Sequence, residues 1–293
     1  MRIGVFAEGR TAVVLDGDDA ADIHGRAAVD VSELTGGEPL HRLIEHGYDF
    51  AAELTRERLA DLPRRAAAGL DWKPPLPRPG KIMGAPANYY DHVDEMPDSA
   101  TIVDWGLFLK APTSVTGHRS TIRLPWSDKR TDQEGELAVV IGKTARHVDP
   151  KDALDHIFGY TCVLDITVRS TEDRSLRKSF DTFTPIGPWI TTADEIPDPS
   201  ALELRCSVNG VLRQHTSTSK LIYGVGELIA YASAAMTLHP GDVIATGTPA
   251  GVGPLSDGDT ISLTIDRIGT LEVAVSADGA IPYLDRPGHK GER

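Results

Sequence analysis

Three acidic residues stand where buried strands are expected, and this pattern indicates a metal site. Glu134 and Glu136 open a run that is otherwise apolar up to Ile141. Because strand residues two apart share a face, the two carboxylates project together. Asp165 interrupts a second apolar run at 157–168, although Asp is uncommon in strands. Buried carboxylates repel one another and lose hydration, and their oxygens favour Mg²⁺ or Mn²⁺ over Zn²⁺.

Each acid also has a simpler interpretation. Glu134 and Glu136 could form a solvated strand edge, and Asp165 could accept backbone hydrogen bonds at a bulge or pair with an arginine. Taken singly, each acid fits its simpler interpretation better. Taken together, three acids on buried strands favour a divalent cation.

A histidine and a glutamate form a candidate general base. His92 and Glu95 are three residues apart, so they share one face of a helical turn. A carboxylate beside an imidazole fixes its tautomer and raises its basicity, which suits proton abstraction. The alternative is an ordinary His–Glu contact on a surface helix.

Two further stretches could contact a substrate. Lys178 precedes an aromatic, apolar run and could stabilise a developing oxyanion, although a surface position is the commoner fate of a lysine. The glycine-rich stretch 245–253 lacks the ending of a nucleotide-binding P-loop. It could instead present backbone N–H groups, as at Gly247, and the Thr248 hydroxyl to a carboxylate, or it could be a plain turn between strands.

The elements that must position these residues are mostly strands. Too few helices accompany them for a doubly wound parallel sheet, so we expect a mostly β fold with some α. A hairpin is expected at 2–7 and 11–15, and Asn209-Gly210 predicts another between 202–208 and 211–216. The other expected strands are 81–84, 106–111, 120–124, 135–142, 157–168, 185–191, 242–246, 260–266 and 271–276. Helices are expected near 38–47, 50–67 and 219–236, the last with Ser219 as its N-cap.

Proline placement predicts the domain organisation. Four prolines at 71–80 exclude a helix or a central strand and indicate an extended linker. We therefore expect a small α/β N-terminal domain at 1–70, a catalytic domain at 81–284 and a polar tail at 285–293. The N-terminal domain carries no recognisable chemistry and is expected to pack against the main domain or a partner subunit.

The bulk composition narrows the class of protein. The formal net charge of −13 argues against nucleic acid as a partner. Cys162 and Cys206 lie in apolar stretches and are expected to be buried free thiols. The first residues do not resemble a signal peptide, and no apolar run could span a bilayer. These features favour a cytoplasmic enzyme without membrane association.

Taken as a set, the motifs resemble the fumarylacetoacetate hydrolase superfamily. They occur in the family order and cover residues 80–276. The matching stretches are 88–92 (NYYDH), 134–143 (EGELAVVIGK), 159–161 (GYT), 178–183 (KSFDTF), 187–189 (GPW), 240–244 (PGDVI) and 246–253 (TGTPAGVG).

The resemblance implies a rolled-up β-sheet in the catalytic domain and a homodimer. It implies Mg²⁺ or Mn²⁺ held by the three acids, and it implies a water-activating dyad formed by the histidine and glutamate. It also places Lys178 near the reacting carbonyl and Thr248 near the carboxylate of a small 2-oxo acid. Arg169 and Gly247 are further candidate substrate contacts.

The implied reaction is hydrolysis of a C–C bond in a 1,3-dioxo acid of the acylpyruvate or fumarylpyruvate type, as in aromatic catabolism. The same site could serve an oxaloacetate-type decarboxylase or a 2-hydroxy-diene-dioate isomerase. A third hypothesis is a non-catalytic protein that binds a metal and a small acid.

The sequence departs from the family motif around the third acid. The Asn-Asp-Val-Ser-Ala-Arg-Asp of many members is replaced here by Leu164-Asp165-Ile166-Thr167-Val168-Arg169-Ser170, and Glu172 stands where Gln is common. These differences leave the substrate's side chain open.

Overall fold

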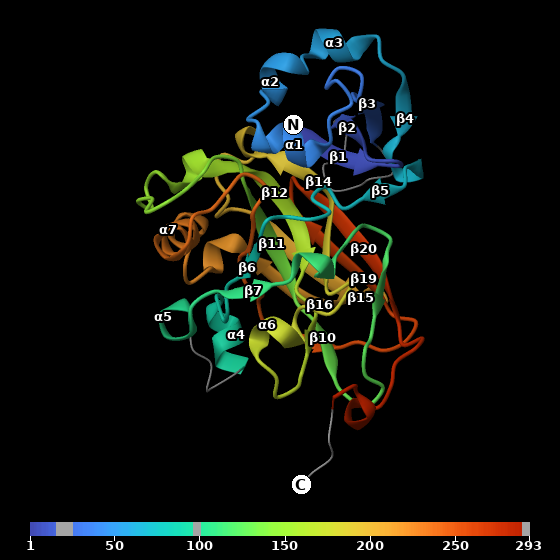
Figure 1. The fold of residues 1–293 in the computed structure, drawn as a ribbon, viewed down its shortest axis with the longest axis vertical. Coiled ribbons are helices and arrows are strands. Elements are labelled where there is room, and N and C mark those ends of the chain that lie inside the picture. Colours follow the sequence, from blue (N-terminus) through green and yellow to red (C-terminus); the bar gives the residue numbers. More distant parts are fainter. Residues whose placement is uncertain (16–25, 96–100, 289–293) are drawn as a thin grey trace.

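A large sheet runs through the molecule from its N-terminal end to the candidate site (Figure 1). The computed structural model describes residues 1–15, 26–95 and 101–288. The sheet order is β4-β3-β2-β1-β14-β12-β11-β17-β6-β7, with β5 beside β1 and β8 beside β14. Its strands are β1 (Arg2–Phe6), β2 (Arg10–Leu15), β3 (Ala27–Asp30), β4 (Arg64–Ala66), β5 (Trp72–Lys73), β6 (Ile82–Gly84), β7 (Phe108–Lys110), β8 (Val115–Thr116), β11 (Gly135–Ile141), β12 (Ile157–Leu164), β14 (Thr184–Thr192) and β17 (Val243–Ala245).

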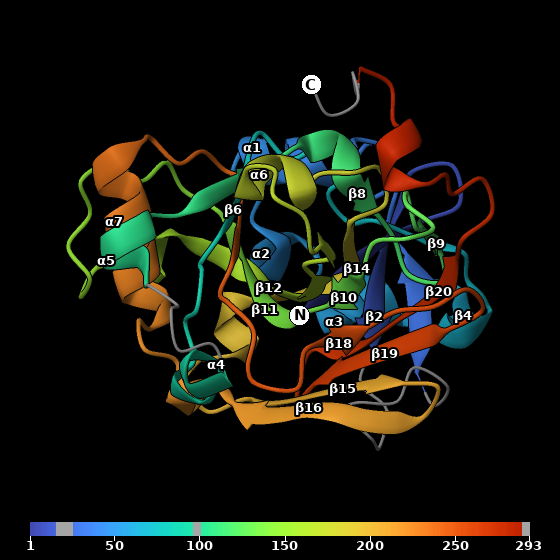
Figure 2. The same ribbon diagram turned by 90° about the horizontal axis from the view of Figure 1, so that it is seen from below.

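Two smaller sheets complete the β structure. The first has the order β16-β15-β19-β20-β9 and lies beside the large sheet (Figure 2). Its strands are β9 (Thr121–Arg123), β15 (Glu203–Val208), β16 (Val211–Ser217), β19 (Thr260–Ile265) and β20 (Gly269–Ser276). The second joins β10 (Thr131–Gln133) to β13 (Thr167–Val168) and β18 (Gly253–Pro254). The prediction of a mostly β fold is confirmed, and every expected strand has a counterpart.

The helices are short. The α-helices are α1 (Leu40–Glu45), α2 (Phe50–Glu53), α3 (Arg56–Ala60), α4 (Tyr90–Glu95), α5 (Ile102–Trp105), α6 (Arg174–Arg177) and α7 (Val225–Ala235). Within the described residues, none of the helices is long and apolar enough to cross a membrane.

Strand β11 separates two apolar clusters. Ala138 and Val140 pack with side chains of the N-terminal region, whereas Leu137, Val139 and Ile141 pack into the main core. This alternation matches the faces predicted for the strand. Strand β1 pairs with β14, so the large sheet continues into the N-terminal region. The proposed boundaries at 70 and 80 stay a prediction, and Trp72 within that stretch is buried.

Two expected helices are wrong in extent. The one expected at 50–67 is divided into α2 and α3, and Arg64–Ala66 forms strand β4 because it finds hydrogen-bonding partners along β3. The one expected at 219–236 begins only after Gly224, whose N–H donates to the Glu227 carboxylate at 2.7 Å. Ser219 therefore lies in a 3₁₀ turn and does not cap the helix.

The strand expected at 157–168 is interrupted, and this interruption shapes the site. Strand β12 ends at Leu164, and β13 resumes at Thr167 in a different sheet. In the gap, the N–H of Asp165 donates to the Glu134 carbonyl at 2.9 Å. The aspartate is thus held beside the chain segment that carries the two glutamates.

Candidate metal centre and active site

The three predicted acids meet at one end of β11 and β12. Gly135 pairs with Leu164 across the two strands, so the neighbouring residues Glu134, Glu136 and Asp165 are brought together. One carboxylate oxygen from each residue lies within 4.8 Å of the others, and all three side chains are buried. The interpretation of the glutamates as a solvated edge is therefore wrong.

Positive charge surrounds this cluster unevenly. Burial alone would raise the pKa of Glu134, but the cations Lys178 and Arg169 outweigh it and lower that pKa to about 2. Burial raises the pKa of Glu136 well above its usual range, and the negative charges of Asp165 and Glu134 raise it further. Glu136 is the carboxylate whose charge is least compensated.

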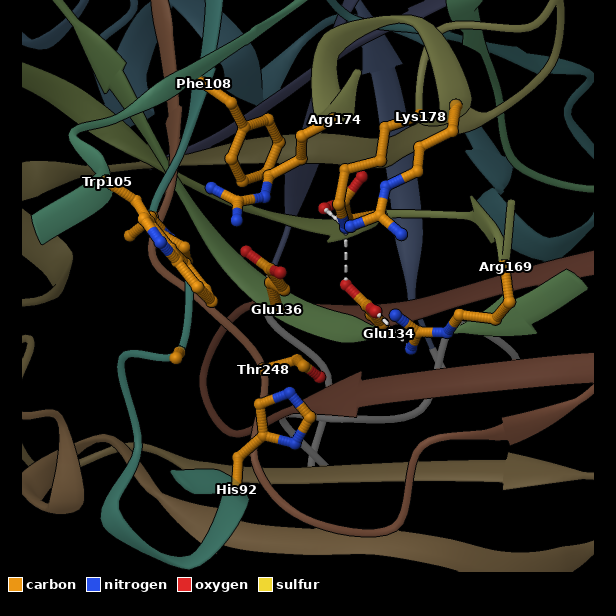
Figure 3. Close-up of a pocket in the computed structure, with 14 residues that line it drawn as sticks. His92, Trp105, Phe108, Glu134, Glu136, Arg169, Arg174, Lys178 and Thr248 are labelled. Atoms are coloured by element: carbon orange, nitrogen blue, oxygen red, sulfur yellow. Dashed lines mark hydrogen bonds and ion pairs between the residues drawn. The ribbon is translucent and has the colours of Figure 1, made fainter. Parts of the chain in front are cut away.

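Two lysines contact the cluster, and only one of them was predicted. Lys178 Nζ donates to Glu134 Oε2 at 2.8 Å (Figure 3), to Asp165 Oδ2 at 2.5 Å and to Thr167 Oγ1 at 2.7 Å. It is buried, which rules out a surface position. Lys110, at the end of β7, pairs with Asp165 Oδ1 and was not predicted. A lysine that ends an apolar strand is ordinary and gave no signal.

Arg169 supports the cluster from its other side. Its guanidinium donates to Asp132 Oδ2 at 2.7 Å and to Glu134 Oε1 at 2.8 Å. Asp132 is fully buried and was not predicted as a site residue. Arg169 thus orients a carboxylate of the cluster, and its contact with substrate stays a prediction.

Helix α4 brings His92 to the cavity as predicted. His92 is 5% exposed and faces the cluster from below in the view of Figure 3. The start of α4 is fixed by Asn88, whose amide donates to the carbonyls of Tyr223 and Thr246 at 2.9 and 2.8 Å. Glu95 ends the helix, but its side chain lies outside the described residues, so its contact with His92 stays a prediction.

The glycine loop is built against the same asparagine. Gly247 has φ +98°, and a Cβ there would lie 2.7 Å from the Cβ of Asn88. Its N–H donates to Glu136 Oε2 at 2.7 Å, so this group already supports a carboxylate. The Thr248 hydroxyl donates to the Gly135 carbonyl at 3.0 Å and accepts from Gln214 at 2.7 Å. Thr248 lines the cavity, and substrate contacts at both residues stay predictions.

A cavity of about 320 Å³ connects these groups, which is within the range for small-molecule sites. Besides the predicted residues it is lined by Ala85, Pro86, Ala87, Trp105, Phe108, Arg174 and Arg177. None of these residues was predicted. Arginines on a short helix resemble a solvated face, and nothing in the local pattern shows which way they point.

Comparison with known families decides the classification. The model of the fumarylacetoacetate (FAA) hydrolase C-terminal domain matches residues 81–276. The chain belongs to the fumarylacetoacetate hydrolase family. This confirms the resemblance found in the motifs.

Two relatives in this family extend the match to 94% and 96% of the chain. A maleylpyruvate hydrolase of Aquipseudomonas alcaligenes is 43% identical over 289 residues, covering 94% of this chain and 99% of that protein. The crystal structure of maleylpyruvate hydrolase from Sphingobium sp. SYK-6, in complex with manganese(II) and pyruvate, has a TM-score of 0.82 and 38% identity. It covers 96% of this chain and 100% of that one. The oxaloacetate tautomerase YisK of Bacillus subtilis is 44% identical over 211 residues, or 67% of this chain and 70% of that protein.

The donor set of this family member fits a hard divalent cation. Glu134, Glu136 and Asp165 can each offer one oxygen, and these oxygens lie within 4.8 Å of one another. Carboxylate oxygens prefer Mg²⁺ or Mn²⁺. Each carboxylate oxygen can accept a second partner, so the lysine contacts leave lone pairs for a metal.

Proposed function

We propose that the protein is a divalent-metal-dependent hydrolase that cleaves a C–C bond in a small 1,3-dioxo acid of the acylpyruvate or fumarylpyruvate type. The observation that carries this proposal is the juxtaposition of three buried carboxylates, Lys178 and His92 around one cavity. The maleylpyruvate hydrolase relatives support it, because maleylpyruvate is itself a 2,4-dioxo acid.

Glu134, Glu136 and Asp165 would hold Mg²⁺ or Mn²⁺. When bound, the metal would supply a Lewis acid for the carboxylate and keto oxygens of the 2-oxo acid. The manganese and pyruvate bound to the Sphingobium enzyme support this assignment.

The chain's own residues would move the proton and orient the substrate. His92, oriented by Glu95, would take a proton from water at an imidazole nitrogen, and the hydroxide would attack the distal carbonyl, C4 of the dioxo acid. Collapse of the oxyanion would break the C3–C4 bond and release one acid, and the protonated His92 would return its proton to C3 of the other fragment, which leaves as pyruvate. Thr248, Gly247 and Arg169 would hold the 2-oxo acid end.

Lys178 would donate to the oxyanion that forms on the attacked carbonyl. An ammonium group has three donors, and all three are already used on Glu134, Asp165 and Thr167. Substrate binding must therefore redirect one of these donors. The Thr167 hydroxyl is the neutral partner and the one whose loss costs least.

A decarboxylase or isomerase is the second candidate function. Neither needs an attacking water, and keto–enol isomerisation needs only proton transfer. The tautomerase relative favours this alternative over a non-catalytic binding protein. Solvent ¹⁸O in the released acid separates hydrolysis from both.

The test is turnover of acetylpyruvate, fumarylpyruvate and oxaloacetate with Mg²⁺ or Mn²⁺, and again after EDTA. EDTA-sensitive cleavage of either dioxo acid supports the hydrolase. Loss of oxaloacetate alone supports the decarboxylase, and enol–keto exchange without cleavage supports the isomerase. A protein that binds Mn²⁺ but turns over none of the three contradicts the proposal.

We also infer a cytoplasmic homodimer. Cys162 and Cys206 are buried free thiols, as expected, and burial raises the pKa of both. Leu109 and Leu176 are exposed apolar side chains near α6, which supports a partner subunit there. The molar mass in solution by light scattering tests the dimer.

A further inference from the structure

Two arginines at one end of the cavity differ from the other cations of the site. Arg169 and Lys178 form ion pairs at 2.7–2.8 Å with buried acids. Arg174 and Arg177, on α6, also line the cavity. Within the described residues, neither has a carboxylate within 4.0 Å of its guanidinium. Figure 3 shows Arg174 entering beside Phe108, on the side opposite His92 and Thr248.

Aromatic side chains hold Arg174 in this position. Its guanidinium carbon lies 4.3 Å from the centroid of the Trp105 ring and 5.9 Å from that of Phe108. Stacking engages the flat face of a guanidinium and leaves its N–H donors free in the plane. The residue is thus oriented before any anion arrives, which reduces the entropy lost on binding.

Arg177 adds a second positive charge with an unsatisfied donor. Its Nε is buried and has no hydrogen-bond partner among the described residues. Burial lowers the pKa of Arg174, and the nearby charge of Arg177 lowers it further. Two like charges and an unused buried donor destabilise this corner of the cavity. An anion bound between the arginines would compensate for both.

The N-cap of α6 offers no competing explanation. Asp173 precedes the helix, but its carboxylate accepts from the Ser175 N–H at 2.8 Å and forms no ion pair with either arginine within 4.0 Å. The arginines are therefore not explained by a structural partner on their own element.

We propose that Arg174, assisted by Arg177, binds a second carboxylate at the far end of the substrate, so that the enzyme prefers dicarboxylic dioxo acids. This rests on the proposed function, in which the 2-oxo acid end of the substrate lies at Glu134, Glu136 and Asp165. The planar fork of an arginine matches a carboxylate, and bidentate pairing adds selectivity as well as affinity.

The kinetic test compares two substrates that differ at the far end. Fumarylpyruvate carries the second carboxylate at C7, and acetylpyruvate ends in a methyl group at C5. In the metal-loaded enzyme, Arg174→Met lowers the ratio of kcat/KM for fumarylpyruvate over acetylpyruvate by roughly 10²-fold, as expected for a lost charge-assisted hydrogen bond. Arg174→Lys keeps the charge and restores part of the ratio. The exposed Arg205→Met is the matched control and leaves the ratio unchanged.

Two outcomes overturn the assignment. If Arg174→Met lowers turnover of both substrates equally, Arg174 positions α6 and Lys178 and does not read the second carboxylate. If the ratio does not change, the arginine has no role in selection. Turnover of acetylpyruvate by the variant also reports that it is folded.

A binding measurement keeps this test independent of the reaction. 2-Oxoheptanedioate has the chain length of fumarylpyruvate but no 4-oxo group, and 2-oxoheptanoate lacks the second carboxylate. Calorimetry on the Mn²⁺-loaded protein should show tighter binding of the dioate, and Arg174→Met should remove the difference. A wild-type protein that binds the two equally contradicts the subsite. A protein that prefers the dioate but cleaves no dioxo acid retains the subsite and loses the proposed hydrolase.

Discussion

The two ends of strands β11 and β12 have opposite character. Toward the N-terminal region they are wrapped in apolar side chains, and Phe158 of β12 meets Phe50 of α2 edge to face at 5.4 Å. At the other end, Glu134, Glu136 and Asp165 are buried together with two lysines. The same pair of antiparallel strands thus has one end in a hydrocarbon core and the other in a charged cluster.

This contrast separates stability from function. The apolar end stabilises the fold by removing surface from water, at roughly 25 cal/mol per Å². The charged end loses hydration, and only ion pairs and a bound cation compensate for the free energy that this costs. We expect changes at the apolar end to lower the free energy of unfolding and leave turnover intact. We expect changes at the charged end to act first on turnover and metal binding.

The largest effect is expected at the charged end. His92→Ala should reduce turnover of a cleaved dioxo acid by roughly 10²–10⁴-fold, the range for a lost general base. Mn²⁺ affinity should be unchanged, because His92 is not among the proposed ligands. His46→Ala, with an exposed imidazole, is the control. Wild-type turnover in the variant would remove His92 from the mechanism.

A tryptophan of β5, beside β1 in the large sheet, tests apolar packing away from the charged cluster. Trp72 is buried, stacks edge to face on Trp189 at 5.7 Å and donates to the Ala67 carbonyl at 2.8 Å. Trp72→Ala should lower the free energy of unfolding by about 3–5 kcal/mol in urea titrations. Leu212→Ala, at an exposed site, should change it by less than about 0.5 kcal/mol. A folded Trp72→Ala protein that no longer binds Mn²⁺ would show that the two ends are coupled.

The apolar end was also the easier one to predict from the sequence. Its strands alternate or run apolar, so their positions follow from periodicity, and Asn209-Gly210 located a hairpin. The short helices were harder, because tertiary contacts overrode propensity: Asn88 accepts from the N–H groups of Ile222 and Tyr223 and keeps them out of α7.

At the charged end, the acids were predicted because they conflicted with their surroundings, whereas Lys178 and Arg169 were predicted from motifs that resemble those of the family. An aspartate in an apolar run drew attention to Asp165, and paired glutamates on one strand face did the same for Glu134 and Glu136. Lys110 and Arg174 gave no such conflict, since cations at strand and helix ends are ordinary. Their place in the cavity depends on how distant segments pack, which a local pattern does not contain.

A buried histidine makes the free energy of unfolding depend on pH. His118 accepts a hydrogen bond from the Glu272 N–H at 3.1 Å, and burial, with a smaller effect of Arg119, lowers its pKa from 6.5 to about 4. The Glu272 carboxylate, 3.9 Å from Nε2, does not reverse this. The folded state binds fewer protons than the unfolded state between these values, so stability falls as pH drops from 6.5 to 4. The expected loss is about 3 kcal/mol.

The variant His118→Asn isolates this contribution. Its amide oxygen can still accept from Glu272, but it does not titrate. The variant should therefore lose about 3 kcal/mol less than wild type over the same pH range in urea titrations. Equal slopes for the two proteins would show that His118 is protonated in the folded state.

The smallest expected effect is the stabilisation of the folded protein by the cation bound at the charged end. A ligand that binds only the folded state stabilises it by about 2.7 kcal/mol at a concentration 100 times its Kd. Mn²⁺ should therefore raise the free energy of unfolding of the wild-type protein by this amount. Glu136→Gln removes the least compensated carboxylate and should remove most of the Mn²⁺ effect. Asp259→Asn, at a partly exposed acid that does not line the cavity, should retain it. If Mn²⁺ stabilises Glu136→Gln as much as wild type, the cation binds elsewhere, and the charged end is held by its lysines alone.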